Sequence, residues 1–361
     1  MIDNRHKYTH NIKKISIKDL CLSLKCEAFI DGEFIDDKLA STLYITHMAD
    51  INVSKDDAGG SIGFLNTGSN AVAGLGRYNM SLDKSRLFAC FVVDKSLTNS
   101  KTIAVVCPDG LSPKVAVNNF MKMFYKIKSF SPSIAKTAHI IDVEFEDKSS
   151  VFIGQNVCIS NAFIGKGAFI GHNSVIENST IEESSYIEDS VSIKFADIGK
   201  KTTVEAGTRI GGRGFGTIIE PPLLTPLDHI GRVKIGSDVS IGNNSTIDRG
   251  MINNTVIKDM TQIDNSVQIA HGVELGKGCL VASHTAIGGS CSIGNGVMIG
   301  GGTLFADHIV VPDFTKFLGG AMVAQSIKKT GIYGTPPVLA DYRTMLRIVS
   351  AVKKLGANKY S

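Results

Sequence analysis

The sequence predicts a mainly β protein whose central part is a parallel β-helix with three-sided coils. Three observations lead to this prediction. Aliphatic residues recur at intervals of six, the 361-residue chain has 37 glycines against 9 prolines, and it contains no tryptophan. Recurrence at a short fixed period is typical of solenoids, and glycine supplies the tight corners that such coils need. A set of ordinary hairpins would instead show period-two alternation and two-residue turns.

The first run of the repeat indicates how many walls the coil has. Five-residue steps interrupt the six-residue spacing after Ile159, Ile176 and Ile193, so every third step is short. A three-sided coil with one corner tightened in three consecutive turns would show this pattern. The aliphatic residues of this run are Ile153, Ile159, Ile164, Ile170, Ile176, Ile181, Ile187, Ile193, Ile198, Val204 and Ile210.

The second run follows an interruption from Gly216 to Lys234, which we interpret as an excursion from the coil that begins at the glycine-rich stretch 211–216. That stretch follows β repeats and opens no helix, which argues against a dinucleotide-binding loop. The aliphatic residues of the second run are Ile235, Ile241, Ile247, Ile257, Ile263, Ile269, Leu275, Val281, Ile287, Ile293 and Ile299.

Residues 1–130 differ from the repeats. They contain short apolar runs at 88–93 and 102–106 and a helical stretch that opens at Pro113 and reaches Lys128. Short apolar strands followed by a helix predict a separate N-terminal α/β domain.

The rest of the chain divides into two predicted parts. Residues 131–323 form the β-helix domain. Residues 324–361 contain two adjacent prolines and then a helical pattern from Val338 to Leu355, which predicts a short C-terminal helical extension.

Composition narrows the classes of protein. The net charge of +4 is modest and no aromatic-and-basic RNA motif accompanies it, so we expect no nucleic-acid partner. The amino terminus lacks the apolar stretch of a signal peptide, and the longest apolar run, Leu87 to Val93, is too short to span a bilayer. These features predict a cytoplasmic protein without a transmembrane segment.

Seven cysteines without CxxC pairs predict reduced thiols and no zinc site, with Cys158, Cys279 and Cys291 as packing residues.

Counting slots along the repeat yields one column of residues on a single face. Its members are the third residues of repeats that begin at Ile247, Ile269, Ile287 and Ala306, namely Arg249, His271, Gly289 and His308. Two imidazoles separated by a glycine are suited to acyl transfer, because glycine leaves room for a thioester and offers its backbone N–H to the oxyanion. His271 is the predicted general base. For His10, His139, His172 and His229 we prefer the plainer interpretation of a solvated surface histidine.

Four motifs resemble those of UDP-3-O-acylglucosamine N-acyltransferases, a family of hexapeptide-repeat enzymes in lipid A biosynthesis. They are STIDRG at 245–250, IDNSVQIAH at 263–271, GRVKIG at 231–236 and GIYGTPP at 331–337. The resemblance covers roughly residues 110–350. It implies a left-handed β-helix and a homotrimer.

The resemblance also implies a reaction. A 3-hydroxyacyl chain passes from acyl carrier protein to the 2-amino group of UDP-3-O-(3-hydroxyacyl)glucosamine. By similarity, His271 is the base, and the N–H of Gly289 and the side chain of His308 stabilise the oxyanion. Asp264, Asn265 and Gln268 line the acceptor and pantetheine region. No metal or cofactor is implied, since the phosphopantetheine of the carrier protein holds the acyl donor.

In that family the N-terminal domain holds uridine through a short aromatic segment. The corresponding stretch here, residues 63–78, is longer than the family pattern. Phe64 and Tyr78 are the candidate aromatic pair, and Asn66 and Asn70 are both candidates for the amide.

The C-terminal helix is basic. Arg343, Arg347, Lys353 and Lys354 form a candidate docking surface for an acidic carrier protein. A solvated helix face is the alternative.

Three competing functions stay open at this point. One is a hexapeptide-repeat sugar acetyltransferase that uses acyl-CoA. Another is a metal-dependent hydratase of the prism type, in which His271, His284 and His308 would converge across a subunit boundary. The third is a scaffold without catalytic activity.

Overall fold

The computed structural model divides into two compact units, Met1–Ser129 and Phe130–Ser361. It describes residues 15–30, 33–34, 44–45, 47–48, 61–64, 89–92, 103–106, 115–116, 118–119, 130–220, 222–334 and 342–357. No helix among these residues is long and apolar enough to cross a membrane.

The first unit combines a sheet with helix α1 (Ile17–Leu24). The sheet order is β3 (Glu33–Phe34), β2 (Glu27–Ile30), β8 (Ile103–Val106), β7 (Ala89–Val92), β6 (Ser61–Phe64) and β5 (His47–Met48), and a separate pair joins β1 (Ile15–Ser16) to β4 (Tyr44–Ile45). The two apolar runs expected at 88–93 and 102–106 are the strands β7 and β8. Of the helix predicted from Pro113, the structure describes residues 115–116 and 118–119, which are helical.

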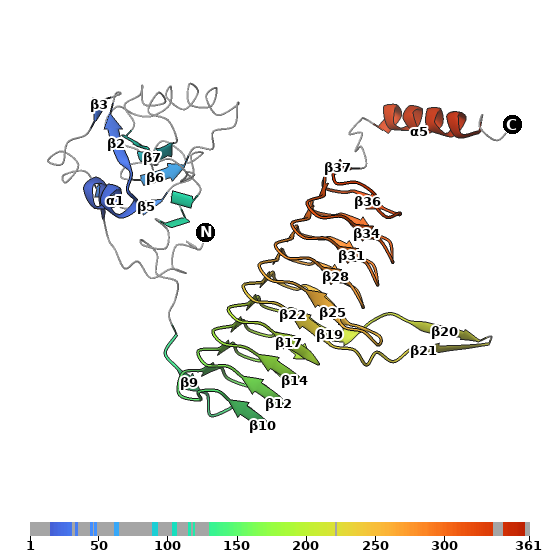
Figure 1. Ribbon diagram of the computed structural model, residues 1–361, viewed down its shortest axis with the longest axis horizontal. Coiled ribbons are helices and arrows are strands. Elements are labelled where there is room, and N and C mark those ends of the chain that lie inside the picture. Colours follow the sequence, from blue (N-terminus) through green and yellow to red (C-terminus); the bar gives the residue numbers. More distant parts are fainter. Residues whose placement is uncertain are drawn as a thin grey trace. The chain divides into compact units, whose positions relative to one another are not determined.

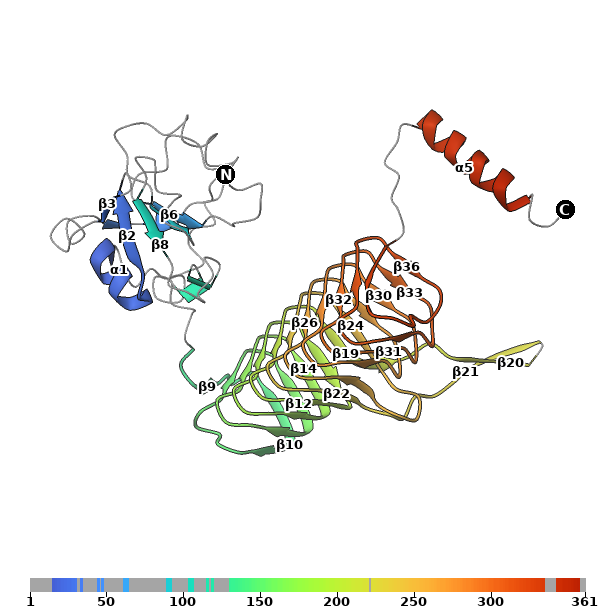
Figure 2. The same cartoon turned by 45° about the horizontal axis from the view of Figure 1, so that its top comes forward.

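The second unit contains the left-handed parallel β-helix that the repeats predict, and both views show its stacked triangular coils (Figure 1; Figure 2). We call its three flat sides wall A, wall B and wall C, in the order in which each coil visits them. Wall A consists of β9 (Ser133–Ile134), β11 (Phe152–Ile153), β13 (Phe169–Ile170), β15 (Tyr186–Ile187), β18 (Thr203–Val204), β23 (Ser240–Ile241), β26 (Gln262–Ile263), β29 (Leu280–Val281), β32 (Met298–Ile299), β35 (Lys316–Phe317) and β37 (Ile332–Tyr333).

Walls B and C are joined in one sheet, which has 16 strands within the described residues. Three seven-residue strands run through both walls: β10 (His139–Phe145), β12 (Cys158–Ile164) and β14 (Val175–Ile181). Wall B continues with β16 (Ser192–Lys194), β19 (Arg209–Arg213), β24 (Thr246–Arg249), β27 (Gln268–Ile269), β30 (Ala286–Ile287), β33 (Leu304–Phe305) and β36 (Met322–Val323). Wall C continues with β17 (Ala196–Ile198), β22 (Val233–Ile235), β25 (Thr255–Ile257), β28 (Glu274–Leu275), β31 (Ser292–Ile293) and β34 (Val310–Val311).

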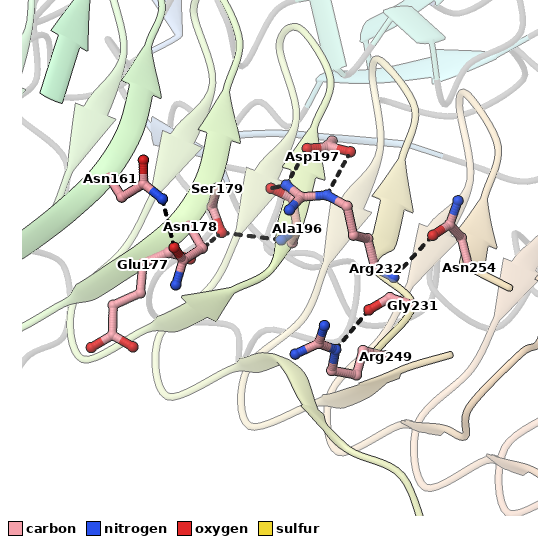
Figure 3. Close-up of polar contacts among 10 residues, drawn as sticks. All are labelled: Asn161, Glu177, Asn178, Ser179, Ala196, Asp197, Gly231, Arg232, Arg249 and Asn254. Atoms are coloured by element: carbon pink, nitrogen blue, oxygen red, sulfur yellow. Dashed lines mark hydrogen bonds and ion pairs between the residues drawn. The ribbon is translucent and has the colours of Figure 1, made fainter. Parts of the chain in front are cut away.

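The tightened corner expected from the five-residue steps lies between walls B and C. Asn161 and Asn178 have φ values of 48° and 51°, and Phe195 turns the next coil with a φ of 50°. One left-handed residue therefore replaces the two-residue turn found at the other corners, and asparagine tolerates that conformation well. The Asn161 side chain also donates a 2.7 Å hydrogen bond to that of Asn178, which stacks the two corners (Figure 3).

The aliphatic residues of both repeat runs fill the inside of the prism, and all of them are buried. Buried isoleucines contribute about 1.5–3 kcal/mol each as an upper estimate, so the column is a large favourable contribution to the folding of the prism. Cys279 and Cys291 are buried packing residues as predicted, and burial raises the pKa of both thiols. The prediction for Cys158 is wrong: it is exposed, because the first residue of β12 points outward.

An excursion leaves the prism where the repeat is interrupted. A bulge in β19 between Ile210 and Gly212 shifts the register of its pairing with β24, which continues to Arg213. The chain then forms the hairpin of β20 (Thr217–Glu220) and β21 (Leu223–Pro226). The hairpin projects from the side of the prism in both views (Figure 1; Figure 2).

The coil continues beyond residue 323, where the sequence-based boundary stood. β37 pairs in parallel with β35, which extends wall A to Tyr333 although the six-residue spacing has already ended. Helix α5 (Tyr342–Ala357) follows within the predicted helical stretch, whose first residues, 338–341, lie outside the described part of the chain. Its Leu346 and Val349 side chains are exposed.

The bulge at Gly211 offers a matched test of the fold. Gly211 (φ +85°) and Gly278 (φ +66°) both adopt left-handed backbone, but a Cβ at Gly211 would collide with the carbonyl oxygen of Lys194, whereas a Cβ at Gly278 would meet no atom within 4 Å. We expect Gly278→Ala to cost about 1–2 kcal/mol. We expect Gly211→Ala to cost several kcal/mol more, because a backbone atom must move. Thermal unfolding by circular dichroism measures both, and equal losses would contradict the collision.

Candidate active site

The corner between walls B and C, hereafter the B/C corner, collects the departures from the regular repeat. The tightened turns, the excursion that follows Gly211 and the insertion 251–254 all occur there. His271 follows β27 at the same corner, and Gly289 follows β30 one coil further on. Strand pairing confirms this part of the column, because Ile247 is in register with Ile269 and Ile269 with Ile287.

The imidazole of His271 lies directly over Gly289. A Cβ built on Gly289 would stand 2.7 Å from both Cε1 and Nε2 of His271. Only glycine leaves this space free, since real Cβ atoms do not approach other atoms so closely. His271 as a residue is half-buried.

The backbone around Gly289 leaves one N–H group available. The N–H groups of Gly288 and Ser290 donate to carbonyl oxygens of neighbouring coils, at 3.1 and 2.9 Å. Within the described part of the chain, the N–H of Gly289 makes no such bond. A donor without a partner beside an imidazole is the arrangement that an oxyanion intermediate requires.

The counted position of His308 is wrong by one residue. Phe305, and not Ala306, is in register with Ile287, so the third slot of that coil holds Asp307. The sequence count placed an extra residue before Ala306, whereas the coil absorbs no insertion there. His308 still borders the site, because its N–H donates to the carbonyl of Gly289 at 2.9 Å. Its φ is 58° and its side chain is 75% exposed.

A polar network lies below His271 on wall B. Gln268 donates through Nε2 to Oδ2 of Asp248 at 2.9 Å and also bonds the hydroxyl of Thr246. Burial raises the pKa of the Asp248 carboxyl, while the hydrogen bond from Gln268 and the charges of His271 and His229 act in the opposite direction. Asp248 is therefore close enough to both imidazoles to interact with a positive charge on either.

The residue that sequence reasoning missed is His229. It was expected to be a solvated surface histidine, but it is buried and its ring centre lies 5.1 Å from that of His271. Nothing in the repeat pattern indicates this, because His229 lies in the interruption 216–234, where no register exists. The motif GRVKIG, which begins two residues later, was the nearest available signal.

Arg249 belongs to the predicted column but contacts the backbone of the returning excursion. Its Nε donates to the carbonyl of Gly231 at 2.6 Å (Figure 3). Its Nη2 donates to the carbonyl of Ile230 at 3.0 Å. The guanidinium also lies 3.8 Å from the ring centre of Phe195. Next to it, Arg232 pairs with Asp197. Arg249 thus fixes the segment that follows His229.

The structure separates two predicted substrate-binding residues from this corner. Asp264 and Asn265 lie between walls A and B, where Asp264 accepts the N–H of Ser283 (3.1 Å) and Asn265 that of Asn243 (2.7 Å). Both side chains therefore link neighbouring coils by hydrogen bonds. They also line a cavity of about 670 Å³ on wall A, whose apolar part includes Leu280, Met298 and Leu318.

The remaining predicted residues are only partly covered by the structure. Phe64 is in β6, but its side chain lies outside the described part, as do Asn66, Asn70 and Tyr78 entirely. Arg343 and Arg347 are exposed on α5, and the side chains of Lys353 and Lys354 lie outside the described part. Within the described residues, His, Cys, Asp and Glu side chains nowhere gather in a group of three that could hold a metal ion.

Comparison with known proteins points to one kind of enzyme. The family model for bacterial transferase hexapeptide repeats (six repeats) matches residues 254–289, a segment that includes His271 and Gly289. UDP-3-O-acylglucosamine N-acyltransferase from Rickettsia conorii is 50% identical over 95 residues, which are 26% of this chain and 28% of that protein. The same-named protein from Rickettsia akari is 48% identical over 93 residues, 26% of this chain and 27% of that protein. The chain thus spans little more than a quarter of the length of these relatives.

Among solved structures, a UDP-N-acetylglucosamine acyltransferase from Bacteroides fragilis is similar with 21% identity and a TM-score of 0.42, covering 58% of this chain and 72% of that one. The resemblance to UDP-3-O-acylglucosamine N-acyltransferases that the motifs indicated is confirmed over the matched Rickettsia segments.

The raised pKa of Asp248 predicts a pH-dependent stability difference. Because burial disfavours the carboxylate, the folded protein binds this proton more tightly than the unfolded chain does. Stability therefore falls as the pH rises from the ordinary pKa of aspartate through the raised pKa of Asp248. Asp248→Asn removes that charge, so we expect a higher melting temperature than wild type at pH 7. The gain should shrink as the pH falls towards about 4, the ordinary value for aspartate. Asp238→Asn, at an exposed corner, is the control, and a gain independent of pH would contradict the assignment.

Proposed function

We propose that the protein transfers a 3-hydroxyacyl chain from acyl carrier protein to the 2-amino group of UDP-3-O-(3-hydroxyacyl)glucosamine, in the cytoplasm. The observation that supports this best is the pairing of His271 with Gly289 at the B/C corner, within the segment matched by the hexapeptide model. The names of the Rickettsia relatives support the class of reaction.

In the proposed mechanism the amine nitrogen attacks the thioester carbonyl directly. His271 takes the proton that nitrogen loses as the C–N bond forms. The N–H of Gly289 and the imidazole of His308 stabilise the negative oxygen of the tetrahedral intermediate. When that intermediate collapses, the C–S bond breaks and the proton on His271 passes to the departing pantetheine thiolate. No covalent enzyme intermediate is involved.

A homotrimer is part of the proposal, and the separation of the two candidate regions supports it. In one chain, wall A lies across the prism from the B/C corner, so the cavity on wall A and His271 cannot contact one small substrate. A closed threefold assembly would bring the B/C corner of one copy to wall A of the next. Asp264, Asn265 and the apolar side chains of the cavity would then line the acceptor and pantetheine region beside the partner's base.

A sugar acetyltransferase that uses acyl-CoA is the second candidate. The shared prism and the same His271–Gly289 pair would serve it equally well. The cavity on wall A favours the longer acyl chain, because its apolar side chains, Leu280, Met298 and Leu318, offer surface that an acetyl group would leave unused.

The central prediction concerns the base. His271→Ala should lower kcat for transfer from 3-hydroxyacyl carrier protein to the UDP-sugar by about 10²–10⁴-fold, the usual contribution of a general base. Gly289→Ala should lower it as well, because its Cβ would displace the imidazole of His271. The measurement is product formation with purified carrier-protein thioesters of several chain lengths.

The control for this experiment is His139→Ala, an exposed histidine on the first coil. Its rate should match that of wild type. Full activity of His271→Ala would refute the mechanism. Faster transfer from acetyl-CoA than from any carrier-protein thioester would favour the acetyltransferase instead.

The basic helix α5 is the proposed docking surface for the carrier protein. The double variant Arg343→Glu and Arg347→Glu should raise the KM for acyl carrier protein about tenfold at low salt, since an acidic partner is then repelled. The increase should fade at high ionic strength because exposed charges are screened. With acyl-pantetheine as donor, the variant and wild type should be equal. An unchanged KM for the carrier protein would show that α5 does not bind it.

A further inference from the structure

The excursion from the prism turns one side chain back into the B/C corner. Among the described residues from Thr217 to Ile230, His229 is the only buried one, with 6% exposure. Apolar hairpin residues such as Leu224, by contrast, are largely exposed. The hydrogen bonds from Arg249 to Ile230 and Gly231 hold the chain immediately after His229. The excursion therefore holds the imidazole of His229 at the B/C corner.

The protonation of His229 follows from its one partner. Its Nδ1 lies 3.2 Å from the carbonyl oxygen of Leu227, which can only accept, so Nδ1 carries the hydrogen. In the neutral ring Nε2 is then a bare acceptor. This nitrogen is buried and is the one such side-chain atom without a partner in the described part of the chain. Leaving a buried acceptor unpaired costs about 1–3 kcal/mol, so its presence calls for an explanation.

The neighbour of the unpaired nitrogen is the proposed base. The rings of His229 and His271 are 5.1 Å apart at their centres, with planes at 73°. Gly214 lies between them, since a Cβ there would stand 2.7 Å from Nε2 of His229 and 2.6 Å from Cβ of His271. At this separation of ring centres, two ring nitrogens that face each other lie about 3 Å apart, the length of a hydrogen bond.

We propose that His229 is a positioning residue whose Nε2 accepts a hydrogen bond from the imidazolium that His271 becomes during transfer. When His271 takes the amine proton, both of its nitrogens carry hydrogen. One N–H faces the reacting groups, and the other is bonded by His229. The bond holds the ring over Gly289 until the proton passes to the pantetheine thiolate. This inference rests on the proposed function.

Other charged groups lie near the two imidazoles. Asp248 on wall B interacts with both, and its Oδ2 is already occupied by Gln268. Asp307, two coils above His271 and in register with it, is exposed. The guanidinium of Arg249 is engaged by Phe195 and the backbone of Gly231. Asp248 is thus the competing acceptor for the second N–H of His271, and the experiments below distinguish it from His229.

The first test compares two replacements of His229. Phenylalanine fills the space without an acceptor, whereas glutamine retains an oxygen that can accept a hydrogen bond. His229→Phe should lower kcat by about 10–100-fold through loss of orientation, with KM for both substrates within about twofold of wild type. His229→Gln should stay within about threefold of wild type. The control is Leu224→Ala on the same excursion, which should leave both parameters unchanged.

These variants separate a positioning role from simple packing. His229→Phe should unfold at the same temperature as wild type or higher, because it removes the unpaired nitrogen. If His229→Phe retained wild-type kcat while His229→Gln lost it, the imidazole would serve only to fill space and the proposal would be overturned.

The second test does not depend on activity. Crystal structures of the wild-type chain at a pH acid enough to protonate surface histidines should place a nitrogen of His271 at about 3 Å from Nε2 of His229. A separation above about 4 Å, or a bond from His271 to Asp248 instead, would overturn the proposal. Absence of transfer activity in the wild type would refute the proposed function, whereas the contact between the two histidines would still be judged from the crystals.

Discussion

The hydrogen bonds between successive coils fix the register on which the rest of this structure depends. Each wall strand pairs in parallel with its equivalent one coil away, so Ile247, Ile269 and Ile287 lie directly above one another. The buried aliphatic column can only be continuous if this register is kept. Any residue outside the column is therefore placed by its distance in sequence from the nearest buried one. This is why His271 and Gly289, one coil apart, lie one above the other.

The prism concentrates its irregularity at one edge. Walls A and B meet at a regular turn. There the side chains of Asp264 and Asn265 accept hydrogen bonds from backbone N–H groups of neighbouring coils. The B/C corner instead carries the tightened turns, the bulge at Gly211 and the hairpin. The N–H of Gly289 has no backbone partner among the described residues, and the excursion brings His229 beside His271. The regular repeats thus place His271 above Gly289, and the interruption adds His229 to them.

Glycines at this corner act by the side chains that they lack. Gly289 leaves space for the ring of His271, and Gly214 leaves space for His229 and His271 to approach each other. Their role is not visible from a count of glycines, because many other glycines of the prism also lie close to the next coil. Gly289 and Gly214 differ because the side chain beside each is an imidazole. The same holds for histidines: His139 is solvated, whereas His229 is buried, although both lie outside the predicted column.

The sequence alone determined the prism, the tightened corner and the stacking of His271 on Gly289, because each follows from counting along a periodic chain whose buried residues are unmistakable. Counting failed where periodicity ended: His308 was displaced by one slot, the last coil was missed because Ile332 and Tyr333 break the spacing, and His229 was taken for a surface residue. Only the tertiary structure decided these points, since the path of a nonperiodic segment depends on contacts such as that of Arg249 with Gly231, which join residues that no spacing rule relates.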